Sequence, residues 1–203
     1  MTRKSISMFS VAATFVATAL GIAVPAPATA HWVQAPCDFI TSGGYVFKDN
    51  GAMANFGAHG GCKNGQFWGH VNFVDHEQNL HVSSIEITGY LYDPASPNSR
   101  DICGWARTND EITVRFRVRL TDNGEPGVND QFGIVLDTQN QIPGDRFYLV
   151  STRKLANGGP GGGNVQLHKS NPSTTASPEM LALTESQMCG DLNTPTPVQP
   201  GEG

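Results

Sequence analysis

The segment from Ile112 to Leu120 restricts the fold of this chain more than any other, because apolar and polar residues alternate along it. Apolar side chains occupy every second position, and the positions between them hold Thr113, Arg115, Arg117 and Arg119. Successive side chains of a β-strand point to opposite faces, so this segment predicts a strand with one buried and one solvated face. The arginine face could hold an anionic glycan, but we favour a solvated face that discourages pairing between sheet edges.

Shorter apolar runs, separated by Gly, Asn and Asp, recur along the chain. Two of them, Gln66 to Asp75 and Leu80 to Tyr92, predict a hairpin. Its turn at residues 76–79 would place His81 opposite Val74. The other predicted strands are Phe39 to Phe47, Ala52 to Ala58, Asp101 to Arg107, Gln131 to Leu136, Phe147 to Thr152 and Asn164 to His168.

These runs predict the fold class. No segment carries a clear apolar stripe at helical spacing, so the crossover helices that a parallel sheet needs are missing. About eight or nine short strands with frequent turns predict an all-β fold, either an antiparallel β-sandwich or a flattened β-barrel. We expect this domain to span residues 31–168. Residues 169–203 are rich in Pro, Ser and Thr and have little to bury, which predicts a disordered C-terminal tail.

Residues 1–30 have the pattern of a secretory signal peptide. A positive start precedes an apolar, uncharged run from Phe9 to Val24, and small residues follow that allow cleavage after Ala28 or Ala30. The apolar run is shorter than the roughly 18–20 residues that a membrane span needs. We therefore expect a protein that is secreted or held at the cell surface, with no transmembrane segment once the signal is removed.

The cysteines are expected to form disulfides, because an exported protein meets an oxidising environment. Cys37, Cys62, Cys103 and Cys189 include no Cys-x-x-Cys pair, which argues against a zinc knuckle or a thioredoxin-like motif. Four cysteines allow three pairings, and the sequence leaves the choice among them open. We expect at least one bridge within the folded domain, with Cys189 either free or tying down the tail.

Several phrases together carry a family resemblance. They are Cys37-Asp38-Phe39-Ile40-Thr41, Asn55-Phe56-Gly57, Gly61 to Gly65, Phe67 to His76, Asp122 to Gly127 with Asp130, and Gly162 to His168. On these phrases the chain resembles the post-COAP domain proteins, a family of bacterial exported domains. The resemblance covers nearly all of residues 37–168, although the region from Gln141 to Pro160 is longer than is usual in the family. It implies a domain that occurs alone or at the end of larger secreted proteins, with no assigned activity and no catalytic residues to carry over.

Two groups of histidines are candidate metal ligands. His76 and His81 could meet near the hairpin turn, with Asp75 or Glu77 as a third ligand, although solvated polar residues are the commoner explanation there. Cleavage after Ala30 would make His31 the mature N-terminus, where its amine and imidazole together could chelate copper. That arrangement needs a second histidine supplied by the fold, and a flexible N-terminus is the favoured alternative.

A turn rich in acids and amides is a candidate calcium site. Calcium prefers hard oxygen ligands on a tightly turned backbone, and this loop could supply them from Asp122, Asn123, Asn129 and Asp130. The loop lacks the spacing of an EF-hand. The alternative is a turn whose Asp and Asn side chains cap their own backbone.

Composition and motifs also limit the function. The chain has 13 Lys and Arg against 18 Asp and Glu, a net charge of −5, which argues against binding of nucleic acid. No catalytic motif of the hydrolases, zinc proteases or P-loop enzymes is present. We therefore expect a structural or ligand-binding module with an extracellular or surface partner, whose binding face could include Phe67, Trp68, Phe73 and Tyr90, although aromatic residues are more often core. The alternatives are a metal-dependent secreted enzyme and a calcium-stabilised adhesion module.

Overall fold

The computed structural model describes residues 31–139 and 146–196, which form one antiparallel sheet of nine strands. The strands lie in the order β8-β7-β6-β5-β4-β3-β2-β1-β9, so neighbours in sequence are neighbours in the sheet until β9 returns to pair with β1. Their bounds are β1 (Phe39–Phe47), β2 (Met53–Lys63), β3 (Gln66–Asp75), β4 (Leu80–Tyr92), β5 (Ser99–Thr108), β6 (Thr113–Thr121), β7 (Gln131–Asp137), β8 (Phe147–Lys154) and β9 (Gly163–His168). The prediction of an antiparallel all-β fold is confirmed.

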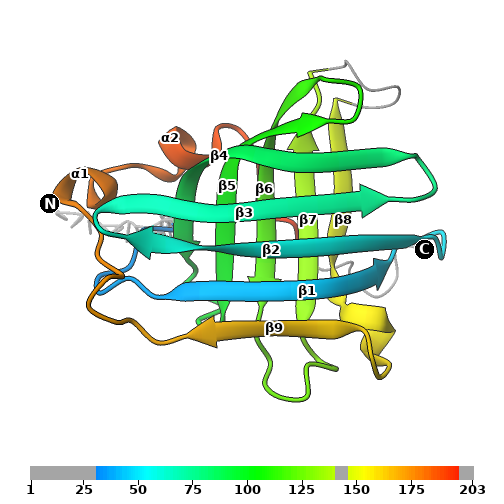
Figure 1. Cartoon of the computed structure of the whole chain (residues 1–203), viewed down its shortest axis with the longest axis horizontal. Coiled ribbons are helices and arrows are strands. Elements are labelled where there is room, and N and C mark those ends of the chain that lie inside the picture. Colours follow the sequence, from blue (N-terminus) through cyan, green and yellow to red (C-terminus); the bar gives the residue numbers. More distant parts are fainter. Residues whose placement is uncertain (1–30, 140–145, 197–203) are drawn as a thin grey trace, which may run out of the picture.

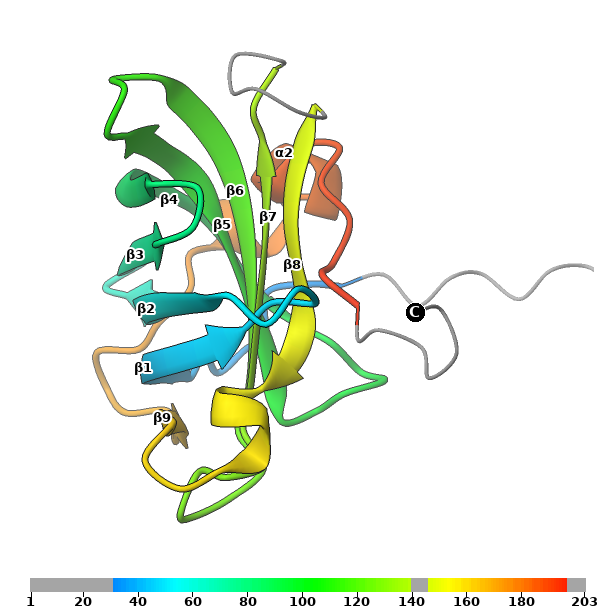
Figure 2. The ribbon, with the colours of Figure 1, turned by 90° about the vertical axis from the view of Figure 1, so that its right-hand side faces the viewer.

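The sheet is strongly curled, so that its two ends face each other as a half-barrel. In Figure 1, β9, β1, β2 and β3 cross in front of β5 to β8, and Figure 2 shows these two layers from the side. β4 carries the sheet from one layer to the other. Its pairing with β5 has register shifts between Ser84 and Glu86 and between Ile87 and Gly89, and such bulges bend a strand and increase its twist.

The core lies between the two layers and follows from the alternation in the sequence. The apolar residues of β6 are buried, as predicted, and they face aromatic side chains from the other layer. Phe132 of β7 stacks on Phe56 of β2 with ring centroids 3.9 Å apart, and its ring lies 6.0 Å from that of Phe73 on β3. Because burial of each such side chain is worth about 1.5–3 kcal/mol, these contacts are a main cause of the curl.

The predicted hairpin is confirmed with its register. β3 and β4 begin and end where the alternation predicted, and Val74 pairs with His81. β2 is longer than predicted and continues to Lys63, because the glycines of its second half still fit an extended strand that pairs with β1 and β3.

Both disulfides fasten segments outside the sheet to strands within it. Cys37, just before β1, is bonded to Cys62 on β2, and Cys103 on β5 is bonded to Cys189. The expectation that the cysteines form disulfides is therefore confirmed, and the pairing left open by the sequence is settled. Disulfides persist in oxidising compartments, which agrees with an extracellular location.

The prediction of a flexible tail is wrong for residues 169–196, which pack against the sheet. They include two short helices, α1 (Pro178–Leu181) and α2 (Glu185–Cys189), which begin at the capping residues Ser177 and Thr184. Met180 and Met188 are buried, and the disulfide at Cys189 holds the segment in place. A few buried apolar residues and one disulfide are enough to order this segment, although its composition resembles that of a disordered chain.

The predicted signal peptide, residues 1–30, and the end of the tail, residues 197–203, lie outside the described residues. Within the part of the chain that the structure describes, no helix has the length and apolar character needed to cross a membrane.

The loop between β6 and β7 secures the edge strand β9. Asp122 accepts the N–H groups of Gly124 and Leu167, at 2.9 and 2.8 Å. The buried Asp130 accepts those of Asn123 and Val165, at 2.8 and 2.7 Å. Carboxylate oxygens thus satisfy backbone donors that a further strand would otherwise bind, which protects the open edge of the sheet.

Replacing Asp130 with alanine should lower the free energy of unfolding by about 2–4 kcal/mol, because it leaves two N–H groups without their acceptor, one of them buried. Asp110→Ala, in the exposed turn before β6, is the matched control and should change stability by less than about 0.5 kcal/mol. Urea unfolding measures both. Equal stability of the two variants would show that the loop does not hold β9.

Candidate ligand-binding site

The hydrogen bonding between β3 and β4 stops partway along both strands. Residues Asn72–Asp75 of β3 pair with Leu80–Ser83 of β4. However, β3 already begins at Gln66, and β4 continues to Tyr92. Beyond Ser83 the bulges of β4 turn it away with β5. The strands therefore diverge, and the edge of β3 before Val71 has no strand beside it.

A short helix packs against β4 just beyond Ile87, the last residue of β4 that borders the split. Thr88 of β4 donates a hydrogen bond to the carbonyl oxygen of Met188 in α2, at 2.6 Å. Gly89 permits this approach, because a Cβ atom there would lie 2.6 Å from the Cβ of Met188. The near end is closed by Ser84, whose hydroxyl accepts the N–H of Val71 at 2.9 Å. The stretch of β3 that has no partner on this side thus runs from Gln66 to His70.

An open pocket of about 410 Å³ occupies the split. That volume lies within the range of about 300–1,000 Å³ that is usual for small-molecule sites. β3 contributes aromatic and imidazole groups to the pocket, and β4 contributes a hydroxyl, a carboxylate and two aliphatic side chains. The lining residues are Phe67, Trp68, Gly69, His70, Ser84, Ile85, Glu86 and Ile87.

Trp68 provides the most unusual polar group of the pocket. Its indole N–H is buried and has no hydrogen-bond partner among the described residues. Buried donors are nearly always paired, and leaving one unpaired costs about 1–3 kcal/mol. The ring lies against His59 and Phe39, with centroids 5.4 and 6.1 Å away. The Nζ atom of Lys63 lies 5.9 Å from the centroid of the same ring.

His70 and Glu86 add further hydrogen-bonding groups. The Nδ1 atom of His70 lies 3.0 Å from the Ser84 hydroxyl oxygen. The hydroxyl, which accepts from Val71, can also donate its proton to Nδ1, and in that tautomer the imidazole proton lies on Nε2 as a second donor. Glu86 is exposed and has no partner among the described residues, so its carboxylate is a free acceptor.

The contact between Ser84 and His70 does not form a hydrolase triad. A nucleophilic serine needs a histidine that is oriented by a third, acidic group. In the part of the chain that the structure describes, no carboxylate is hydrogen-bonded to His70. The pocket therefore holds groups suited to binding, and it contains no assembled nucleophile.

His59 stands directly opposite His70 on the neighbouring strand β2. Burial, together with the nearby charge that His70 can carry, lowers the pKa of His59 below its ordinary value. The folded state thus binds the His59 proton more weakly than the unfolded chain does. Stability contributed by neutral His59 is complete above about pH 6.5, its unfolded pKa, and is lost as the pH falls from there through the lower pKa of the folded state.

We expect the free energy of unfolding to decrease when the pH is lowered from about 8 to about 5.5, and this decrease to be smaller in His59→Gln. His76→Gln, in the exposed hairpin turn, should keep the full decrease. Urea unfolding across this pH range measures the effect. An unchanged pH profile in His59→Gln would contradict the assignment.

The predicted metal ligands at the hairpin are each engaged elsewhere. The Nε2 atom of His76 lies 2.6 Å from Asn55 Oδ1, and that of His81 lies 3.1 Å from Asn72 Nδ2. Within residues 31–139 and 146–196, no group of three or more His, Cys, Asp or Glu side chains is arranged to hold a metal ion. For the calcium loop, the observed contacts are those of the alternative, in which Asp122 and Asp130 bind backbone N–H groups. Both metal sites remain predictions that these contacts do not support.

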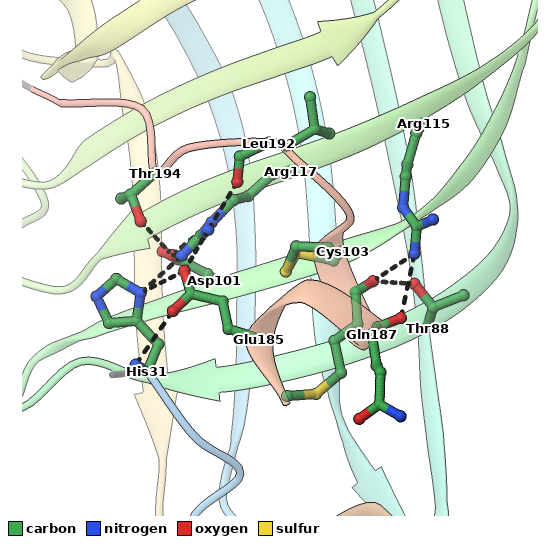
Figure 3. The surroundings of a disulfide bond; sticks show 12 residues. His31, Thr88, Asp101, Cys103, Arg115, Arg117, Glu185, Gln187, Leu192 and Thr194 are labelled. Carbon is green, nitrogen blue, oxygen red and sulfur yellow. Dashed lines mark hydrogen bonds and ion pairs between the residues drawn. A yellow bond between two sulfur atoms is a disulfide. The ribbon is translucent and has the colours of Figure 1, made fainter. Parts of the chain in front are cut away.

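The arginine stripe of β6 is not a solvated face, and this prediction is wrong. Arg117 is 1% exposed, because residues 185–194 and His31 cover this side of β5 and β6. Figure 3 shows these segments around Arg117, beside the disulfide of Cys103. Alternation showed which residues share a face of the sheet, but it carried no information on what covers that face.

Carboxylates balance the buried arginines. Asp101 on β5 binds Arg117 at 2.5 Å and Arg119 at 2.7 Å. Arg117 also binds Glu185 of α2 at 2.6 Å, and Arg119 binds Asp93 at 2.5 Å. Arg115 donates to the carbonyl oxygens of Gln187 and Met188. The network joins β5 and β6 to the C-terminal segment.

Arg117→Leu should lower the free energy of unfolding by about 3 kcal/mol, because it leaves part of a buried carboxylate network uncompensated. Arg107→Leu is the control. Its side chain is 54% exposed and pairs with Glu111 at 3.3 Å, so its loss should cost less than about 1 kcal/mol. Denaturant unfolding separates the two. Similar losses in both variants would mean that the buried network contributes no more than a surface pair.

Comparisons of the chain with protein-family models, with curated proteins and with solved structures find no match. Membership of the post-COAP domain proteins therefore stays a prediction. Of the aromatic residues considered for a binding face, Phe73 and Tyr90 are core, whereas Phe67 and Trp68 line the pocket. The contribution of Ser84 and Glu86 was missed, because it depends on the divergence of two strands that pair normally at their other end.

Proposed function

We propose that this protein is an exported binding module that holds a neutral, hydroxyl-bearing ligand, a saccharide ring, in the pocket between β3 and β4. The observation that carries the proposal is that Trp68 lines this pocket and that its buried indole N–H lacks an acceptor among the described residues. A ligand that supplies an acceptor would remove the cost of leaving this donor unpaired.

The mixture of polar groups favours a saccharide. Trp68 and His70 offer N–H donors, while Glu86 offers an acceptor. A sugar hydroxyl both donates and accepts, so neighbouring hydroxyls on one ring can satisfy all of these groups. A ligand with only anionic oxygens would face the Glu86 carboxylate, and a simple cation would face N–H donors. The apolar faces of a sugar ring also suit the aromatic and aliphatic walls of the pocket.

The dimensions of the split argue against an added peptide strand. A strand that binds to the edge of a sheet is typically about 5–6 residues long. On β3 the pocket is lined by Phe67, Trp68, Gly69 and His70, and the stretch without a partner strand ends where Val71 contacts Ser84. Export is supported by the two disulfides and by the signal-peptide pattern of residues 1–30.

The test is binding of the purified protein to an array of gluco-, galacto-, manno- and N-acetylglucosamine oligosaccharides, followed by calorimetry with those that bind. Trp68→Phe keeps an aromatic ring but removes the N–H, so it should weaken binding about tenfold or more. Glu86→Gln should weaken it too, since the amide replaces one acceptor oxygen with a donor.

Trp32→Phe is the matched control, because Trp32 lies before β1 with its ring 5.4 Å from that of Tyr92 and does not line the pocket. It should bind like the unmodified protein. Failure of every saccharide to bind, or equal affinity in Trp68→Phe, would overturn the proposal.

A further inference from the structure

The contacts of His31 point to a role for the N-terminus itself. Figure 3 shows His31 among Glu185, Arg117 and Asp101, on the covered face of β5 and β6. Its backbone nitrogen lies 3.3 Å from Glu185 Oε2, and its Nδ1 atom lies 3.0 Å from Oε1 of the same carboxylate. The backbone nitrogen and the Nδ1 atom of His31 thus both face the carboxylate of Glu185.

Charges around His31 are not balanced by the arginines alone. The connected carboxylates are Asp93, Asp101 and Glu185, whereas the connected guanidinium groups are those of Arg117 and Arg119. One negative charge is left over. Uncompensated charge in a partly buried site is costly, so a further cation in this position would stabilise the network.

The imidazole of His31 lies between charged groups of both signs. Arg117 approaches Nδ1 to 2.7 Å, and a guanidinium group has only N–H donors to offer. The same Nδ1 atom lies 3.0 Å from Glu185 Oε1, and Nε2 lies 3.5 Å from Asp93 Oδ2, so the ring contacts two carboxylates as well. A second group of His31, the backbone nitrogen, also faces Glu185. As part of a peptide bond it is neutral, but as a free α-amine it carries a positive charge at neutral pH.

We propose that His31 is the mature N-terminus and that the ammonium group created by cleavage after Ala30 pairs with Glu185. Cleavage would then supply the cation that the network lacks and would fasten α2 to the sheet. The backbone of the next residue, Trp32, supports this placement, since it exchanges hydrogen bonds with Tyr92 at 3.3 and 2.7 Å. This inference rests on the predicted signal peptide and is independent of the saccharide pocket.

Burial opposes ionisation of Glu185, but hydrogen bonds from His31 and Arg117 hold its pKa below the ordinary value. Glu185 is therefore the anionic partner that an ammonium group requires. The same pairing would occupy the two nitrogens needed for copper chelation at His31.

The test compares chains that begin at His31, chains that carry Gly-Ser before it, and chains whose α-amine is acetylated. Each is made with Glu185 and with Glu185→Gln. Removing the ammonium charge by either route should lower the melting temperature by about 2–4 °C, the shift expected for about 1 kcal/mol in a domain of this size. In the Glu185→Gln background, both modifications should have no effect, because the partner charge is absent.

Glu179→Gln in α1 is the matched control, and it should keep the full loss of melting temperature. Equal melting temperatures of the free and acetylated chains would overturn the ion pair, as would an undiminished loss in Glu185→Gln. The intact mass of protein exported by cells tests the processing separately. A mass that starts at Thr29 would overturn His31 as the mature N-terminus, whatever the melting temperatures show.

Discussion

β4 changes its pairing partway along its length, and both the shape of the sheet and its pocket depend on this change. It stays paired with β5 through its bulges, whereas its pairing with β3 ends at Ser83. The bend lets the sheet fold over on itself, so that Phe132 from one layer reaches Phe56 and Phe73 of the other. The same divergence leaves the edge of β3 open at Gly69, where the pocket forms.

The face of β5 and β6 that points away from the core is covered by two segments. One, at His31, precedes the sheet in the sequence, and the other, residues 185–194, follows it. Burying arginines is unfavourable unless each finds carboxylate or carbonyl partners. Here Asp101 comes from the sheet, while Glu185 and the carbonyl oxygen of Leu192 come from the C-terminal segment. The disulfide between Cys103 and Cys189 keeps that segment in position. The covering segment also contacts β4, where Thr88 donates a hydrogen bond to the carbonyl oxygen of Met188.

Local patterns in the sequence were sufficient to predict the strands. The alternation from residue 112 to 120 predicted which side of β6 faces the apolar core. The turn at residues 76–79 predicted the pairing of Val74 with His81. The burial of Arg117 could not be predicted in this way, because the residues that cover it lie far away in the sequence. The ordered tail was missed for the same reason, since its stability comes from a disulfide and a few buried methionines.

Only part of the pocket could be predicted from the sequence. Trp68 and Phe67 were recognised as candidates for a binding face, but nothing in the sequence of β4 predicted that this strand would leave β3 at Ser84. Bulges depend on packing against the opposite layer, and this packing is set by residues distant in the chain. The orphaned N–H of Trp68 is likewise a property of the assembled fold.

Amide hydrogen exchange of β3 tests the central claim most directly. The N–H groups of Gly69 and Phe73 point to the same side of β3, because alternate residues of a strand do so. Phe73 faces Val82 of β4, whereas Gly69 faces the split. The account predicts slow exchange at Phe73 and exchange at Gly69 that is faster by orders of magnitude and slows when a saccharide binds. Equal protection of the two amides in the free protein would show that β3 and β4 stay paired and that there is no split.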